Sequence, residues 1–322
     1  MMPTRRILLG LIATLAGVSC AQRGPRMIGL LVPWKETSAR EVLDDLAKEM
    51  LALGYDEPRL SIVLRTADSV NSRLPMLAEE LVRLKVDLIV AASTNAVVAV
   101  RRASSTIPIV FFVVADPVAS GLAESLARPG RNNTGLTNFS NAELSTKRVE
   151  LARQLLPDLA RAALLINPIS ATGDYEKVVR EAWDKFGFRE IVVRASSLQE
   201  LDAAFREITA FHAQLVFVQI DAFFGDVAGQ IAEFLIRNRL ASMFQHPGPV
   251  EAGGLMGFGA DDEDVMHRVA PYVDKILRGE KASDLPIQQP RKLSLAINLK
   301  TAAAIGLKIP HLLLLQANRV IE

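Results

Sequence analysis

Short apolar runs alternate with longer segments of helical period along the first half of this sequence, and this alternation limits the chain to few folds. The pattern is typical of βαβ units, in which parallel strands lie side by side and helices cover them. Residues 107–114 are apolar almost throughout, as a strand buried on both faces must be. Strands are predicted over residues 27–33, 60–64, 86–91 and 107–114, and helices over 38–53 and 74–84.

The second half of the chain repeats the pattern. Strands are predicted over 162–166, 190–193 and 215–220, and helices over 175–186 and 198–211. Two successive open sheets of similar layout predict an α/β protein of two doubly wound parallel-sheet lobes joined by a hinge near residues 133–139. The expected organisation is a signal peptide over 1–21, lobe 1 over 22–134, lobe 2 over 135–260, and over 261–322 a helix returning to lobe 1 with C-terminal crossover elements.

The first 21 residues have the features of an export signal. Arg5 and Arg6 precede an apolar stretch at 7–18, which is too short to span a bilayer comfortably. Cleavage after Ala21 would release a free periplasmic protein, whereas cleavage before Cys20 would leave a lipid-anchored amino terminus. Both alternatives stay open, although Gly17 stands where the lipoprotein pattern has an aliphatic residue.

Composition argues against several other classes of protein. Lys and Arg number 37 against 36 Asp and Glu, and aromatic residues make up only 6% of the chain, so nucleic acid is not an expected partner. With Cys20 as the sole cysteine, an intramolecular disulfide or a thiolate-rich metal site cannot form. No later segment is apolar for the roughly twenty residues of a membrane span, so the mature chain is expected to be soluble, with contact to the membrane only through a possible lipid at Cys20.

Ligands of open α/β sheets bind beyond the carboxyl ends of the strands, where helices begin and backbone N–H groups are unpaired. Polar and aromatic residues follow most of the predicted strands at these points. The candidate ligand-binding residues are Trp34, Ser93, Thr94, Asn95, Asp116, Asn167, Asp221, Phe224 and His246.

Each candidate has a structural alternative. One of Ser93–Asn95 can simply cap the helix that follows. Asp116 before Pro117 is the pattern of a helix cap with proline in the first turn. Trp34 can pack on its own lobe. Asn167 can serve to start a turn without contacting a ligand. Phe223 and Phe224 can belong to the core.

Glycines and acidic residues late in the chain predict a strand with a hinge and the start of a helix. Gly253, Gly254, Gly257 and Gly259 are expected in a strand and hinge that need close backbone approach. The acidic run 261–264 lacks the ligand spacing of a calcium loop, so it is predicted to cap and begin a helix.

No catalytic motif is evident in the sequence. A dinucleotide fingerprint, a P-loop, an HExxH motif and a nucleophile elbow are all missing, and the four histidines are scattered. We therefore predict a protein that is not an enzyme, with no catalytic residues, no bound metal and no cofactor.

Several ordered motifs resemble one known family, the tryptophan- and tyrosine-binding-like periplasmic components of ABC transporters. The resemblance extends over about residues 27–322, although residues 34–70 follow it loosely. Its motifs are Ala92-Ser93-Thr94-Asn95, Ile107-Pro108-Ile109-Val110-Phe111, Ala115-Asp116-Pro117-Val118, Ser125-Leu126-Ala127-Arg128-Pro129-Gly130, Asn133-Thr134-Gly135-Leu136-Thr137, Ile166-Asn167-Pro168, Ala252-Gly253-Gly254-Leu255, Ile276-Leu277-Arg278-Gly279-Glu280-Lys281, Leu285-Pro286 through Gln289-Pro290, and Ile297-Asn298-Leu299-Lys300-Thr301-Ala302.

This resemblance implies a type I periplasmic-binding fold that closes on a small molecule and delivers it to an ABC permease and its ATPase. An amino acid is one ligand class that it suggests. For such a ligand, the helix start at 93–95 would hold the carboxylate and Asp221 the ammonium group. The alternative function is a sensing module that presents its bound state to a membrane receptor.

The export signal leads to a prediction about the mature chain. We expect it to begin at a lipid-bearing Cys20 or near Gln22, and intact-mass measurement on the exported protein distinguishes the two. Retention of residues 1–19 on most molecules would contradict export.

Overall fold

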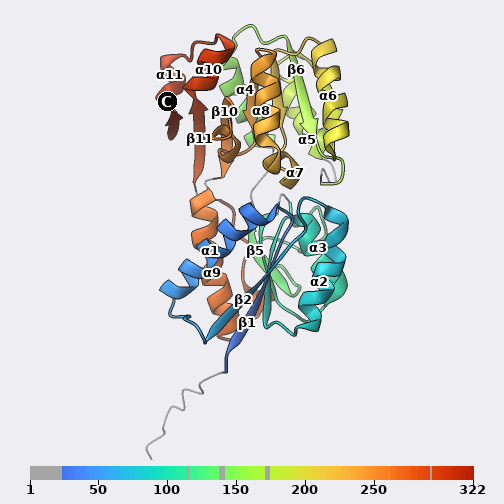
Figure 1. Ribbon diagram of the computed structural model, residues 1–322, viewed down its shortest axis with the longest axis vertical. Coiled ribbons are helices and arrows are strands. Elements are labelled where there is room, and N and C mark those ends of the chain that lie inside the picture. The colour runs from blue at the N-terminus through green and yellow to red at the C-terminus, as the bar shows by residue number, and fades with distance from the viewer. Residues whose placement is uncertain (1–23, 115, 138–141, 171–174, 261, 291) are drawn as a thin grey trace, which may run out of the picture.

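Two lobes are stacked along the long axis of the computed structural model (Figure 1). The structure describes residues 24–114, 116–137, 142–170, 175–260, 262–290 and 292–322. The expected signal peptide lies outside the described residues. Each lobe is built on one sheet with helices on both faces.

Lobe 1 has a parallel five-stranded sheet in the order β2-β1-β3-β4-β5. Its strands are β1 (Arg26–Val32), β2 (Leu60–Thr66), β3 (Leu88–Ala92), β4 (Ile109–Val114) and β5 (Asn133–Thr137). Its helices are α1 (Glu36–Ala52), α2 (Leu74–Arg83), α3 (Thr94–Ala103) and α9 (Asp262–Leu277), with short 3-10 turns at Asn71–Arg73 and Ala282–Asp284.

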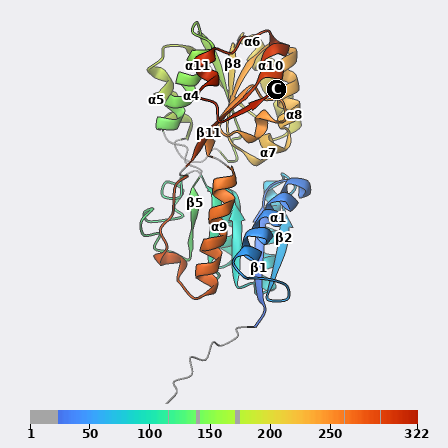
Figure 2. The same cartoon turned by 90° about the vertical axis from the view of Figure 1, so that its left-hand side faces the viewer.

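Alternation along β1 shows how the sheet divides the lobe 1 core. Ile28, Leu30 and Val32 pack in the cluster that contains residues of α1 and α9, whereas Leu31 packs in the cluster of α2 and α3. Successive side chains of a strand point to opposite faces, so a strand buried on both faces must be apolar at every position. Figure 2 shows α1 and α9 together on one side of the sheet.

Lobe 2 has a seven-stranded sheet in the order β12-β11-β10-β9-β8-β6-β7. Its strands are β6 (Arg161–Ile166), β7 (Arg189–Arg194), β8 (Leu215–Val218), β9 (Ala241–Phe244), β10 (Met256–Ala260), β11 (Leu293–Asn298) and β12 (Arg319–Ile321). Its helices are α4 (Ala142–Leu155), α5 (Tyr175–Asp184), α6 (Leu198–Ala210), α7 (Ala222–Asp226), α8 (Ala228–Arg237), α10 (Leu299–Ile305) and α11 (His311–Leu314), with a 3-10 turn at Gly248–Val250.

The chain passes between the lobes after β5, after β10 and before β11. The helix expected to return to lobe 1 is α9, whose first residue described is Asp262; the acidic side chains at 261–264 lie outside the described residues. β5 continues to Thr137 and pairs with β4, so the chain leaves lobe 1 three residues later than the boundary expected at Thr134. Part of the expected hinge, residues 138–139, lies outside the described residues.

The strands and helices predicted in both halves are confirmed, with ends that differ by a few residues. The sequence patterns did not predict that β11 pairs antiparallel to β10. β11 enters the lobe 2 sheet directly from lobe 1, and β11 with its parallel neighbour β12 runs in the opposite direction to the other strands of this sheet.

Close backbone approach is confirmed at Gly257 and Gly259, whereas the atoms nearest to a Cβ at Gly253 and Gly254 belong to the side chains of Ala232 and Phe244. A Cβ added at Gly259 would lie 2.1 Å from the carbonyl oxygen of Gln245, and one at Gly257 would lie 2.4 Å from that of His246. Both contacts are shorter than any tolerated packing distance, so β10 accepts only glycine at these two positions.

We expect Gly259→Ala to lower the free energy of unfolding by about 3 kcal/mol, because the backbone on both sides must shift. The control is Gly229→Ala in α8, where an added Cβ meets nothing within 4 Å and alanine favours the helix by up to about 1 kcal/mol. Urea denaturation measures both. Equal stability of the two variants would contradict the steric argument.

Candidate functional site

The carboxyl ends of the parallel strands in each lobe face the other lobe. The backbone N–H of Lys35, just after β1, donates to the carboxylate of Asp226 at the end of α7, over 3.1 Å. Figure 1 shows α7 at the face of lobe 2 that is turned toward lobe 1. We call the segments after β1–β4 the lobe 1 edge, and residues 167–170, 219–226 and 245–248 the lobe 2 edge.

The start of α3 forms one part of the lobe 1 edge. Ser93 has φ 78° and its hydroxyl accepts from the Ala96 N–H over 3.4 Å, so it caps the helix. The side chains of Thr94 and Asn95 are half-buried and make no hydrogen bond within the described chain. Their polar groups, together with the free N–H groups of the first turn, can therefore bind an anionic group.

Trp34 and Asp116 complete the candidates of lobe 1. Trp34 is half-buried, with its ring centroid 5.9 Å from that of Phe112. Asp116 is exposed and accepts from the N–H groups of Val118 and Ala119, each over 2.9 Å. Asp116 thus caps a turn, and no helix follows Pro117, contrary to the expected helix cap.

Asn167 and Asp221 lie together on the lobe 2 edge. The Asn167 amide donates to Asp221 Oδ1 over 3.0 Å, and the Ser170 hydroxyl donates to Oδ2 over 2.6 Å. Asp221 Oδ1 also accepts from the backbone N–H groups of Phe223 and Phe224, at 2.9 and 3.3 Å. Asp221 therefore caps α7 and joins the ends of β6 and β8.

The remaining candidates of lobe 2 differ in exposure. Phe224 is 1% exposed and packs in the core between the sheet, α6 and α8. His246 is half-buried after β9, and its Nδ1 accepts from the Gly248 N–H over 3.3 Å. The side chain of Phe224 is thus buried in the core of lobe 2, whereas that of His246 is partly accessible on the lobe 2 edge.

A buried arginine behind the lobe 2 edge was not predicted. Arg148 of α4 donates from Nε to the carbonyl of Phe258 over 2.9 Å and from Nη2 to that of Gln245 over 3.1 Å. Burial lowers the pKa of Arg148 to about 10, so the side chain remains charged at neutral pH. One sequence feature could have identified this residue. Arg148 has the helical spacing that places it on the same face of α4 as the buried residues Ser145 and Ala152.

The amide of Gln245 links this arginine to the lobe 2 edge. It donates to the hydroxyl of Tyr175, and its Oε1 accepts from the Ile220 N–H over 3.1 Å. Burial raises the pKa of the Tyr175 hydroxyl, which stays neutral. The ends of β8, β9 and β10 are therefore held in one hydrogen-bonded network.

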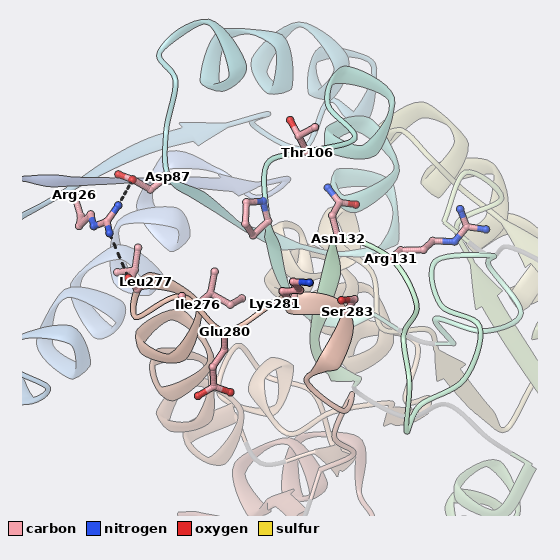
Figure 3. Close-up of a pocket in the computed structure, with 13 residues that line it drawn as sticks. Arg26, Asp87, Thr106, Arg131, Asn132, Ile276, Leu277, Glu280, Lys281 and Ser283 are labelled. Carbon is pink, nitrogen blue, oxygen red and sulfur yellow. Dashed lines mark hydrogen bonds and ion pairs between the residues drawn. The ribbon is translucent and has the colours of Figure 1, made fainter. Parts of the chain in front are cut away.

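A separate cavity of about 490 Å³ lies at the opposite end of lobe 1 (Figure 3). Its wall includes Asn132 before β5 and an ion pair of Arg26 with Asp87 at 2.6 Å, and Arg26 also donates to the Leu277 carbonyl at the end of α9. These residues lie where the strands begin, so this cavity is not part of the candidate site.

The described residues contain no group of three or more His, Cys, Asp and Glu side chains placed to hold a metal ion. Among the helices that the structure describes, none combines the length and the hydropathy of a membrane span.

Two α/β lobes with facing strand ends and three chain passages define the type I periplasmic-binding fold, a clamp for small molecules. The family model for ABC transporter substrate binding proteins matches residues 27–321. The chain therefore belongs to the ABC transporter substrate-binding protein family, whose members bind solutes and are not a class of enzymes.

Several known proteins are similar to this chain in sequence or structure. A tyrosine-binding protein of Clostridioides difficile (strain R20291) is 24% identical over 257 residues, which cover 79% of this chain and 73% of that protein. The crystal structure of a conserved domain protein from Vibrio cholerae O1 has a TM-score of 0.85 at 24% identity, covering 92% of this chain and 99% of that one. An ABC domain from Streptococcus pneumoniae in complex with L-Trp has a TM-score of 0.84 at 22% identity, covering 92% and 100%.

We expect Arg148→Met to lower the free energy of unfolding by about 1–3 kcal/mol, because two buried carbonyls lose their donor. Lys147→Met, one position away and more exposed, is the control and should change stability by less than about 0.5 kcal/mol. Chemical denaturation measures both. A loss for Arg148→Met no larger than the control would contradict the network.

Proposed function

We propose that this protein binds an aromatic L-amino acid between its lobes outside the cytoplasm and delivers it to an ABC permease and its ATPase. The observation that carries the proposal is a difference between the facing edges. Lobe 1 offers unpaired polar groups at the start of α3, whereas lobe 2 offers the carboxylate of Asp221. An amino acid carries the two opposite charges that fit these groups.

The carboxylate of the ligand binds at the start of α3. Thr94 and Asn95 supply a hydroxyl, an amide and backbone N–H groups, and the positive end of the helix dipole favours an anion. Ser93 fixes this first turn as its cap. The described chain places no carboxylate in hydrogen-bonding contact with Thr94 or Asn95 that would compete with a ligand.

The ammonium group of the ligand binds at Asp221. This carboxylate is half-buried and makes no ion pair within the described chain. Its hydrogen bonds from Asn167, Ser170 and α7 hold it in one orientation but leave its charge uncompensated. Asn167 therefore acts as a positioning residue for Asp221.

Trp34 provides an aromatic surface for the side chain of the ligand, supported from behind by Phe112. The C. difficile relative named for tyrosine binding and the S. pneumoniae structure with L-Trp support an aromatic amino acid. His246 lies on the lobe 2 edge, whereas Phe224 and Asp116 support the edges through the core and a turn.

The family and the expected signal peptide support export of the protein and its partnership with a permease and an ATPase. Arg5 and Arg6 before an apolar stretch support secretion, with either a lipid at Cys20 or a free amino terminus. The family model supports transport, and the comparisons offer no support for the alternative of a sensing module.

The test compares L-tyrosine and L-tryptophan binding by wild type and Asp221→Asn in calorimetry. Asparagine keeps the oxygen that caps α7 but removes the charge, so the melting temperature should change little. Loss of one partner of a buried ion pair costs about 3–5 kcal/mol. At about 1.4 kcal/mol per tenfold, affinity should fall by roughly two to three and a half orders of magnitude.

Asp202→Asn, which removes an exposed carboxylate on α6, is the control and should bind as wild type does. Binding by Asp221→Asn within about threefold of wild type would contradict the ammonium assignment. Failure of wild type to bind either amino acid in the same titrations would contradict the ligand class.

A further inference from the structure

Asp226 of lobe 2 makes hydrogen bonds to lobe 1 where the two edges face each other. Its Oδ2 accepts from the Lys35 backbone N–H over 3.1 Å and from the Ser69 hydroxyl, and its carbonyl accepts from Lys35 Nζ over 3.3 Å. Lys35 and Ser69 follow β1 and β2, 191 and 157 residues away in the chain. One carboxylate of lobe 2 thus binds two loops of lobe 1.

The geometry points to Asp226 as a latch that holds the lobes closed and stabilises the closed clamp over the open one. This inference deepens the proposed function, because closing is the step that encloses a ligand.

Helix α1 supports the latch independently. Lys35 is the N-cap residue of α1, and its side chain makes no capping hydrogen bond to this helix. The carboxylate of Asp226 accepts from the Lys35 N–H at the positive end of the helix, which is the backbone group that the side chain of the third helical residue satisfies in a capping box. Lobe 2 thus supplies a cap for a helix of lobe 1, and separation of the lobes exposes that helix end to water.

The donors on lobe 1 are held in place before any contact with lobe 2. The Ser69 N–H donates to the Pro33 carbonyl over 2.7 Å, and the Ala67 N–H donates to that of Val32 over 3.0 Å. Asp68 and Ser69 both have positive φ, at 50° and 62°, a conformation that residues with side chains adopt only when their surroundings require it. Closing therefore orders mainly the Asp226 side chain.

The latch also couples closing to pH. Burial raises the pKa of Asp226 to about 6; the nearby carboxylates of Asp221 and Asp68 act in the same direction, and Lys35 opposes them. Asp68 is itself paired with Arg73. Separation of the lobes returns Asp226 to water and to a pKa near 3.8. The closed arrangement thus holds the proton more tightly, so closing becomes more favourable as pH falls through 6.

The test measures the distance between the lobes by energy transfer between two dyes. In a Cys20→Ala background, Glu79→Cys on α2 and Arg206→Cys on α6 provide exposed attachment points, because the native side chains make no hydrogen bond or ion pair within the described chain. The ligand-free full chain is compared as wild type, Asp226→Ala, Asp226→Asn and Ser69→Ala, with Asp202→Asn as the matched control. Circular dichroism verifies that each variant is folded.

At pH 7.5 we expect Asp226→Ala to shift molecules to the open distance and Ser69→Ala to do so by less. Asp226→Asn keeps an acceptor without the charge, so it should retain the closed population. Between pH 7 and 5 the closing equilibrium of wild type should rise about tenfold, whereas Asp226→Asn should not respond.

The latch is overturned if Asp226→Ala gives the same distances as Asp202→Asn, or if the pH response persists in Asp226→Asn. A titration with L-tyrosine and L-tryptophan on the same labelled proteins separates the two proposals. Absence of binding would refute the ligand class alone, because the distances without ligand decide the latch.

Discussion

Three passages of one chain between two sheets are the constraint on which the rest of this structure depends. The chain leaves lobe 1 at the carboxyl end of β5 and leaves lobe 2 at the carboxyl end of β10. In a parallel sheet all carboxyl ends lie at one edge, so these passages bring the two edges face to face. Residues from many separate loops therefore meet at one place, which is the requirement for a clamp.

The two edges differ in how their polar groups are satisfied. On lobe 2, Arg148, Gln245 and Asp221 join the ends of neighbouring strands through hydrogen bonds, so this edge is preorganised. On lobe 1, Thr94 and Asn95 remain without partners in the described chain. A ligand that pairs with these groups gains hydrogen bonds and displaces none within the protein, which favours binding over a structural role.

The charges at the facing edges cannot be inferred from the net charge of the whole chain, which is close to zero. Asp68 and Asp221 lie close enough to Asp226 to raise its pKa, with Lys35 beside Asp226 and Arg73 paired with Asp68 as the nearby cations. Crowding of like charges in a partly buried place costs free energy unless a proton or a cation compensates it. The ammonium group of a ligand and a proton on Asp226 would both reduce this repulsion, so ligand binding and acidity would act on closing in the same direction.

The alternation of apolar runs predicted four strands of lobe 1, three strands of lobe 2 and four helices, because a strand covered on two faces must be apolar along its whole length. Strand ends also placed Ser93–Asn95 and Asp221 where helices begin, as the structure has them, and a ligand at these residues stays a prediction. Tertiary structure alone decided that β11 runs antiparallel, that Arg148 is buried and that Asp226 reaches Lys35. These features depend on contacts between residues far apart in the chain, and local periodicity carries no information about such contacts.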